Sequence, residues 1–108
     1  MPNTYKILGQ VNASGVNTDL YIVPSGYQAV TSTLSACPIG AASYLRVACI
    51  PSGQSIQNKH YIMYNTYVNQ YDSLFLTLGL TLNQSEKITV YASGGSPVSF
   101  SLFGTEIN

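Results

Sequence analysis

The sequence predicts an all-β protein that folds as an antiparallel β-sandwich of about eight strands. Its clearest strand is Leu74–Leu82, where leucine occupies every even position and mostly small or polar residues fill the odd ones. Successive side chains of a strand point to opposite faces, so the five leucines share one face, whereas a helix would scatter them. Other short strand-like runs recur roughly every eight to twelve residues between turn-forming residues, which is typical of a sandwich.

Four strands are predicted in the first half of the chain, at Tyr5–Val11, Asp19–Val23, Tyr27–Ala36 and Ser43–Ile50. The second ends at a Pro-Ser-Gly turn, residues 24–26, and residues 51–53 repeat that turn after the fourth. Alternation gives Ile7 and Leu8 opposite faces. It groups Val30, Leu34 and Ala36 on one face of the third strand, and Leu45, Val47 and Cys49 on one face of the fourth, opposite Tyr44, Arg46 and Ala48.

The second half is expected to supply the other strands. They are Lys59–Tyr64, the leucine strand, Lys87–Ala92 and a last strand from Val98 to Phe103, with a polar connection over residues 65–71. Gly79 is expected to bend the leucine strand or split it, and Leu76 and Leu78 are expected in the core. In the Lys87–Ala92 strand the inner face is either Ile88 and Val90 or Thr89 and Tyr91, and in the last strand it is Val98, Phe100 and Leu102.

No long linker divides the chain, so residues 1–108 are expected to form one domain. The strand spacing fits either a jelly-roll or an immunoglobulin-like sandwich, and periodicity alone also leaves a small barrel open.

The two cysteines, Cys37 and Cys49, are expected to be reduced. If the third and fourth strands pair as a hairpin, Ser43 lies opposite Cys37 and Cys49 lies a strand length away. The start of the chain lacks the apolar run of a signal peptide, so we expect folding in the cytoplasm, where disulfides are rare. Two thiols and one histidine are also too few for a structural zinc site.

Charged residues make up only 7% of the chain, the net charge is zero, and 45% of the residues are hydrophobic. No basic patch is present for nucleic acid, and no apolar run is long enough for a membrane helix. A chain with so little charge has almost no electrostatic repulsion between copies, so we expect it to self-associate.

The sequence contains no catalytic or cofactor-binding motif, and we expect no enzyme activity, no metal and no cofactor. His60 has no nucleophile or orienting carboxylate nearby in sequence and is expected at the surface or in an interface. The four carboxylates, Asp19, Asp72, Glu86 and Glu106, could form a paired site only if the fold brought two together.

Four tyrosines form the one candidate interface, Tyr61, Tyr64, Tyr67 and Tyr71. Such a group can stack sugars, line a contact between subunits, or pack in ordinary cross-strand pairs.

Six segments of the chain carry a family resemblance, and they are Lys6–Gln10, Thr18–Gly26, Asn58–Ile62, Leu78–Leu82, Val90–Ser93 and Phe103–Ile107. Together they resemble a family of small virion structural proteins of tailed phages, especially phages of aquatic bacteria including cyanobacteria. The resemblance covers nearly the whole chain and carries no catalytic residue. It implies a protein of the virion, assembled in the host cytoplasm, most concretely a capsid decoration (cement) protein that binds the major capsid protein or another virion protein.

The alternative that the resemblance leaves open is a tail-fibre or baseplate component, with the tyrosines as a receptor- or carbohydrate-binding surface. A homotrimer is the favoured oligomer, because icosahedral shells offer threefold junctions and tail fibres are commonly trimeric. Cyclic symmetry would give each copy the same contact.

Overall fold

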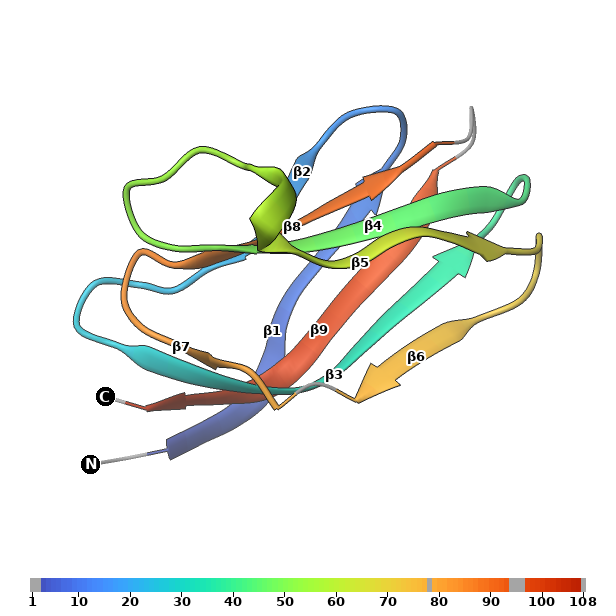
Figure 1. Ribbon diagram of the computed structural model, residues 1–108. Helices are drawn as coiled ribbons and strands as arrows, with labels where there is room; N and C mark the ends of the chain where they lie inside the picture. The colour runs from blue at the N-terminus through green and yellow to red at the C-terminus, as the bar shows by residue number, and fades with distance from the viewer. Residues whose placement is uncertain (1–2, 78, 94–96, 108) are drawn as a thin grey trace.

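The computed structural model describes residues 3–77, 79–93 and 97–107. These residues form nine strands and one 3₁₀ turn (Figure 1). They are β1 (Asn3–Ala13), β2 (Thr18–Ile22), β3 (Gln28–Pro38), β4 (Ser43–Ile50), η1 (Asn58–His60), β5 (Tyr61–Val68), β6 (Leu74–Thr77), β7 (Thr81–Leu82), β8 (Lys87–Ala92) and β9 (Val98–Ile107).

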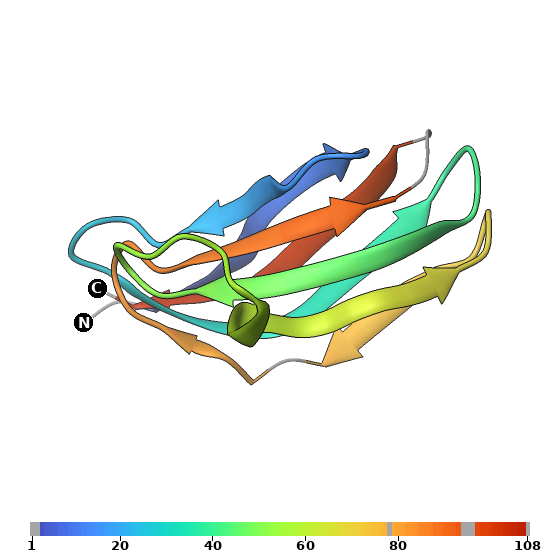
Figure 2. The ribbon, with the colours of Figure 1, turned by 45° about the horizontal axis from the view of Figure 1, so that its top comes forward.

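The strands form two antiparallel sheets that face one another, as a β-sandwich requires (Figures 1 and 2). One sheet has the order β1-β9-β3-β6, with β7 also paired to β3, and the other has the order β2-β8-β4-β5. Every connection crosses between the sheets except β4–β5 and β6–β7. With β6 and β7 counted as one interrupted strand, this is the jelly-roll order of two four-stranded sheets. An immunoglobulin-type sandwich keeps more consecutive strands within one sheet.

The core lies between the sheets and contains the residues that alternation assigned to it in β9, together with one of the two faces left open in β8. Val98, Phe100 and Leu102 are fully buried, and so are Ile88 and Val90, which decides the face of β8. The partners of β9 on β3 are Leu34 for Leu102 and Ala36 for Phe100, and both are also fully buried. In β1, Leu8 packs against the core while Ile7 is exposed, so the two lie on opposite faces as predicted, and the structure decides which face is the inner one.

The leucine stretch is split into β6 and β7, as expected from Gly79. Leu74, Leu76 and Leu80 pack against the core and Leu82 is buried within it, whereas Phe75 is exposed. The predicted face is therefore confirmed, although Leu76 is only partly buried. Leu78 lies outside the described residues.

The prediction that Val30 shares the core face with Leu34 and Ala36 is wrong. The pairing of β3 with β9 shifts register between Thr31 and Thr33, which marks a β-bulge. Alternation changes phase at the bulge, so Thr31 turns inward and Val30 outward. Thr31 Oγ1 is buried without a hydrogen-bond partner among the described residues.

The proposed hairpin of the third and fourth strands is also wrong. β3 pairs with β9, β6 and β7, while β4 pairs with β8 and β5 in the other sheet. The residue opposite Cys37 is therefore Ser99 of β9 and not Ser43. The loop between β3 and β4 is a crossover because each strand has an apolar face to bury against the opposite sheet. Both cysteines are free, as predicted, but they are separated by lying in different sheets.

The surface position predicted for His60 is wrong, since His60 ends η1 and is only 6% exposed. The backbone N–H of Gln57 donates to Nδ1 at 3.0 Å, so the ring proton is on Nε2, which donates to Gln54 Oε1 at 3.1 Å. Both partners belong to the β4–β5 loop, which with η1 lies over the outer side of β4 (Figures 1 and 2). This cover explains why outward-facing Ala48 is fully buried.

Candidate functional site

The four tyrosines of the candidate interface lie on β5 and in the turn that follows it. The expected connection over residues 65–71 is wrong in its first part, because β5 continues to Val68. Tyr64 and Tyr67 are about half exposed, Tyr61 is partly buried, and Tyr71 is the most exposed. Tyr71 has a positive φ of 68°, and its backbone N–H donates to the carbonyl oxygen of Pro38 at the end of β3. Tyr71 therefore lies in the turn that leads from β5 to the other sheet.

A β-bulge in β5 sets the direction of Tyr64. Leu45 pairs with Thr66 and Val47 with Met63, so Tyr64 and Asn65 together face the single residue Arg46. Asn65 has a φ of 55°, a left-handed conformation that asparagine tolerates better than most residues. Because bulges redirect side chains, both residues of β5 can meet Arg46 on the outer face of the sheet.

Arg46 lies between two aromatic rings. Its Cζ atom is 4.4 Å from the centre of the Tyr64 ring and 4.6 Å from that of Tyr91, its partner on β8. Its Nε donates to Asn65 Oδ1 at 2.7 Å, which fixes the plane of the guanidinium group. Sequence reasoning did not select Arg46 or Tyr91, although the shared strand face of Tyr44 and Arg46 was a signal that could have led to them.

The remaining rings extend this cluster along β4 and β5. Tyr44 and Tyr67 pack edge to face with centroids 5.1 Å apart, and Tyr61 and Tyr64 do so at 4.9 Å. An open hollow of about 390 Å³ lies beside the second pair and is lined by Asn58, Tyr61 and Tyr64. We call these residues the tyrosine surface, comprising Tyr44, Arg46, Asn58, Tyr61, Tyr64, Asn65, Tyr67 and Tyr91. Tyr71 has no ring contact with it in the described part of the chain.

The outer side of the other sheet is a second candidate surface. It carries apolar side chains in neighbouring strand positions, where Ile7 is paired with Phe103 and Tyr5 with Thr105. Tyr5 is 79% exposed and Phe75 is 68% exposed. An open groove of about 470 Å³ runs beside Tyr5, Ile7 and Phe103. We call this surface the apolar face, defined by Tyr5, Ile7, Val30, Phe75 and Phe103.

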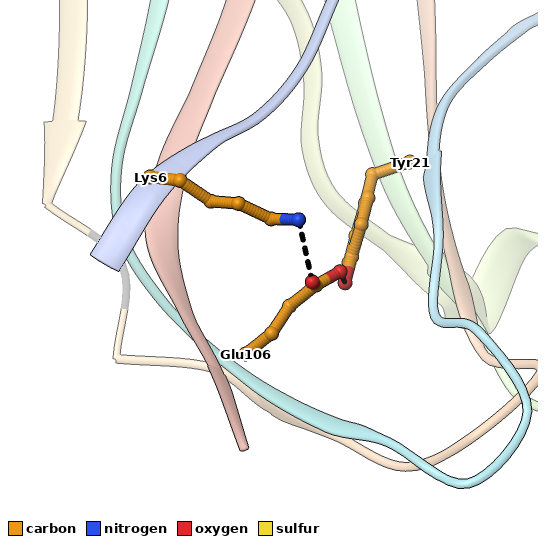
Figure 3. A network of polar contacts seen from close by, with 3 residues as sticks. All are labelled: Lys6, Tyr21 and Glu106. Carbon is orange, nitrogen blue, oxygen red and sulfur yellow. Dashed lines mark hydrogen bonds and ion pairs between the residues drawn. The ribbon is translucent and has the colours of Figure 1, made fainter. Parts of the chain in front are cut away.

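A polar cluster built on the buried carboxylate of Glu106 lies at the end of the sandwich where the first and last strands pair (Figure 3). Lys6 Nζ is 2.7 Å from Glu106 Oε1, and the Tyr21 hydroxyl donates to Glu106 Oε2. Burial by itself raises the pKa of Glu106, but the hydrogen bonds from Lys6 and Tyr21 and the charge of Lys6 outweigh it and hold the pKa below its usual value. Burial and the neighbouring carboxylate raise the pKa of Tyr21. The cluster links β1, β2 and β9, so we assign it a role in stabilising the fold.

The other three carboxylates serve local contacts instead of a paired site. Asp19 accepts from the Thr89 hydroxyl and lies 3.5 Å from Lys87. Glu86 accepts from the backbone N–H of Asn83, and Asp72 belongs to the turn after β5. Among the described residues no group of three metal-ligating side chains comes together, and no helix there has the length and apolar character to cross a membrane.

No protein-family model matches the chain, and no curated protein matches it either. The roles of the tyrosine surface and the apolar face are therefore argued from their residues and geometry.

Proposed function

We propose that the protein is a structural protein of a phage virion, most concretely a capsid decoration protein that binds across junctions between capsid subunits. The observation that carries this proposal is the apolar face. Its groove brings Tyr5, Ile7 and Phe103 together, and grouped exposed apolar side chains of this kind mark contact sites in soluble proteins.

The apolar face is suited to docking because its defining residues carry no charge. Lys6 also lines the groove, but its ammonium group is paired with Glu106. Its aromatic members, Tyr5, Phe75 and Phe103, are of the residue class enriched at interfaces between proteins. A partner can cover this face without removing an unpaired charge from water, which is the most costly part of forming many interfaces.

Binding of this kind would stabilise an assembled shell by mass action, since the protein would bind the assembled state and not its free subunits. A homotrimer matches threefold junctions of such a shell, and the major capsid protein is the expected partner. The role requires no catalytic residue, cofactor, nucleic acid or membrane. The virion resemblance of the sequence and the occurrence of jelly rolls in viral capsid domains support the proposal.

The tyrosine surface favours a second candidate function, a receptor- or carbohydrate-binding module of a tail fibre or baseplate. Its hollow has aromatic walls and an amide at its rim, and its volume falls within the range of small-ligand sites. Jelly rolls also occur in lectins, which supports this candidate at the level of fold.

The number of copies per purified particle tests the two functions. Quantitative gel analysis of the virions that carry this protein should give hundreds of copies if it decorates the capsid. A few to a few dozen copies would instead assign it to the tail, and its absence from purified particles would contradict both functions. Phe75→Asn, which places an amide in the apolar face, should reduce the capsid copy number without unfolding the protein.

A further inference from the structure

We propose that Arg46 is the anion-binding part of a site for an acidic saccharide, and that the sugar ring occupies the hollow beside Tyr61 and Tyr64. This inference rests on the second function proposed above, saccharide binding by the tyrosine surface, and specifies the ligand as one that carries a carboxylate.

The first observation is the pairing of the basic residues. Lys6 and Lys87 have carboxylate partners, at 2.7 Å from Glu106 and 3.5 Å from Asp19. Arg46 and Lys59 have none among the described residues, and of these two Arg46 is the one held between two aromatic rings of the tyrosine surface. Its charge is thus available to an anion from outside the protein.

The second observation is that the guanidinium group is already held in one orientation. Tyr64 and Tyr91 pack on it, and Asn65 Oδ1 accepts the hydrogen bond from Nε, so the four N–H groups at the two terminal nitrogens have no hydrogen-bond partner among the described residues. A carboxylate binds such a planar fork through two parallel hydrogen bonds. Because the arginine is ordered before binding, little side-chain entropy is lost when the anion arrives.

The third observation is that Tyr64 belongs to both parts of the site. It packs against Arg46, and with Tyr61 and Asn58 it lines the hollow. The C–H face of a pyranose can pack on a tyrosine ring while its hydroxyls meet the Asn58 amide and the tyrosine hydroxyls. Arg46 does not line the hollow, so the proposed pose requires the carboxylate of a uronic acid, one bond from the sugar ring, to reach past Tyr64, the residue that contacts both. The two tyrosine rings that line the hollow favour a sugar over an acidic peptide as its occupant.

Calorimetric titration with matched saccharides tests the site. The ligands are oligosaccharides of glucuronic, galacturonic and mannuronic acid, each compared with its neutral parent sugar. At least one acidic ligand should bind about tenfold more tightly than its parent, and added salt should reduce that preference. Arg46→Gln should remove the preference for the acidic ligand over its neutral parent. Arg46→Lys keeps the charge but lacks the fork, and should lose most of the preference.

Lys87→Gln is the matched control, because it removes one positive charge from the same sheet and should leave the preference unchanged. Equal binding of acidic and neutral sugars, or an unchanged preference in Arg46→Gln, would overturn the inference and leave saccharide binding intact. Absence of binding to every sugar would overturn both. Binding of a polyglutamate peptide that is lost in Arg46→Gln would overturn the saccharide assignment and make Arg46 a protein-contact residue. Thermal unfolding of each variant verifies its fold.

Discussion

The hydroxyl of Tyr21 donates a 2.5 Å hydrogen bond to the carboxylate of Glu106, 85 positions later in the sequence and in the opposite sheet. Figure 3 shows Lys6 reaching the same carboxylate from β1. Both Tyr21 and Glu106 are buried, so the hydrogen bond between them replaces hydrogen bonds that each group would otherwise make to water. This relationship fixes the two sheets to one another at the end where the chain begins and finishes.

Tyr21→Phe should lower the free energy of unfolding by about 1–3 kcal/mol, since it removes a buried hydrogen bond to a charged group. Chemical denaturation measures the loss. Glu106→Gln provides the matched test, because the same Tyr21→Phe change should cost less where no charge is present. An equal cost in both backgrounds would contradict the coupling of these two residues.

Stability should fall at acid pH because Glu106 titrates at a lower pH in the folded protein than in the unfolded chain. The unfolded carboxyl takes up its proton near its usual pKa of 4.5, so the free energy of unfolding should decrease as pH falls below about that value. The loss ends below the folded pKa. Denaturation of wild type and Glu106→Gln across this pH range measures the effect. The variant should show a smaller decrease, and parallel curves would contradict the prediction.

At alkaline pH the same cluster should lose stability through Tyr21. Its folded pKa is raised, by burial first and then by Glu106, whereas the unfolded phenol ionises near its usual 10.0. The unfolded chain therefore releases this proton first, and the free energy of unfolding should fall above about pH 10. Tyr21→Phe should show a shallower decrease in the same measurement, and an unchanged slope would contradict this assignment.

Two phenylalanines on opposite faces of one sheet should respond differently to truncation. Phe100 is fully buried, so Phe100→Ala should cost about 3–5 kcal/mol through lost burial and the cavity left behind. Phe75 is 68% exposed, so Phe75→Ala should change the stability of dilute protein by no more than about 0.5 kcal/mol. Thermal or urea unfolding distinguishes them, and similar losses of stability in the two variants would contradict the assignment of the two faces.

Gly104 should not tolerate a side chain. A Cβ atom there would collide with the carbonyl oxygen of Val30 on the adjacent strand and lie 3.0 Å from Thr31 Cα. Gly104→Ala should therefore lower the free energy of unfolding by about 1–3 kcal/mol. Gly79→Ala is the control, because no described atom lies within 4 Å of its Cβ position. A harmless Gly104→Ala in denaturation experiments would contradict the close approach of β9 and β3.

The protein should self-associate, with a trimer as the expected form. The apolar face leaves large side chains in water, and their burial between copies would be favourable. Raising the salt concentration should not dissociate the oligomer, because few charges would contribute to the contact. Light scattering at micromolar concentration, in low and high salt, measures both properties. The double variant Ile7→Asn and Phe75→Asn should weaken association, and a monomer mass of wild type in both buffers would contradict the prediction.

The candidate site was only partly predictable from the sequence. The spacing of tyrosines identified Tyr61, Tyr64 and Tyr67, because aromatic residues that are close in sequence stand out by composition alone. Arg46 and Tyr91 come from two other strands, and Tyr64 faces Arg46 only because a bulge at Asn65 adds one residue to β5. The backbone geometry of a bulge leaves little trace in a hydrophobic pattern.

The sequence by itself determined the all-β class, the positions of most strands and the inner faces of β6 and β9, whereas it left the inner face of β8 open between two alternatives. These are consequences of a period of two residues and of turn chemistry, which act over a few neighbouring positions. Tertiary structure alone decided the jelly-roll order, the crossover of β3 and β4, the inward turn of Thr31, the burial of His60 and the meeting of Tyr21 with Glu106. Each depends on which distant segments pack together, and that is set by the burial of whole faces and the pairing of buried polar groups across the sandwich.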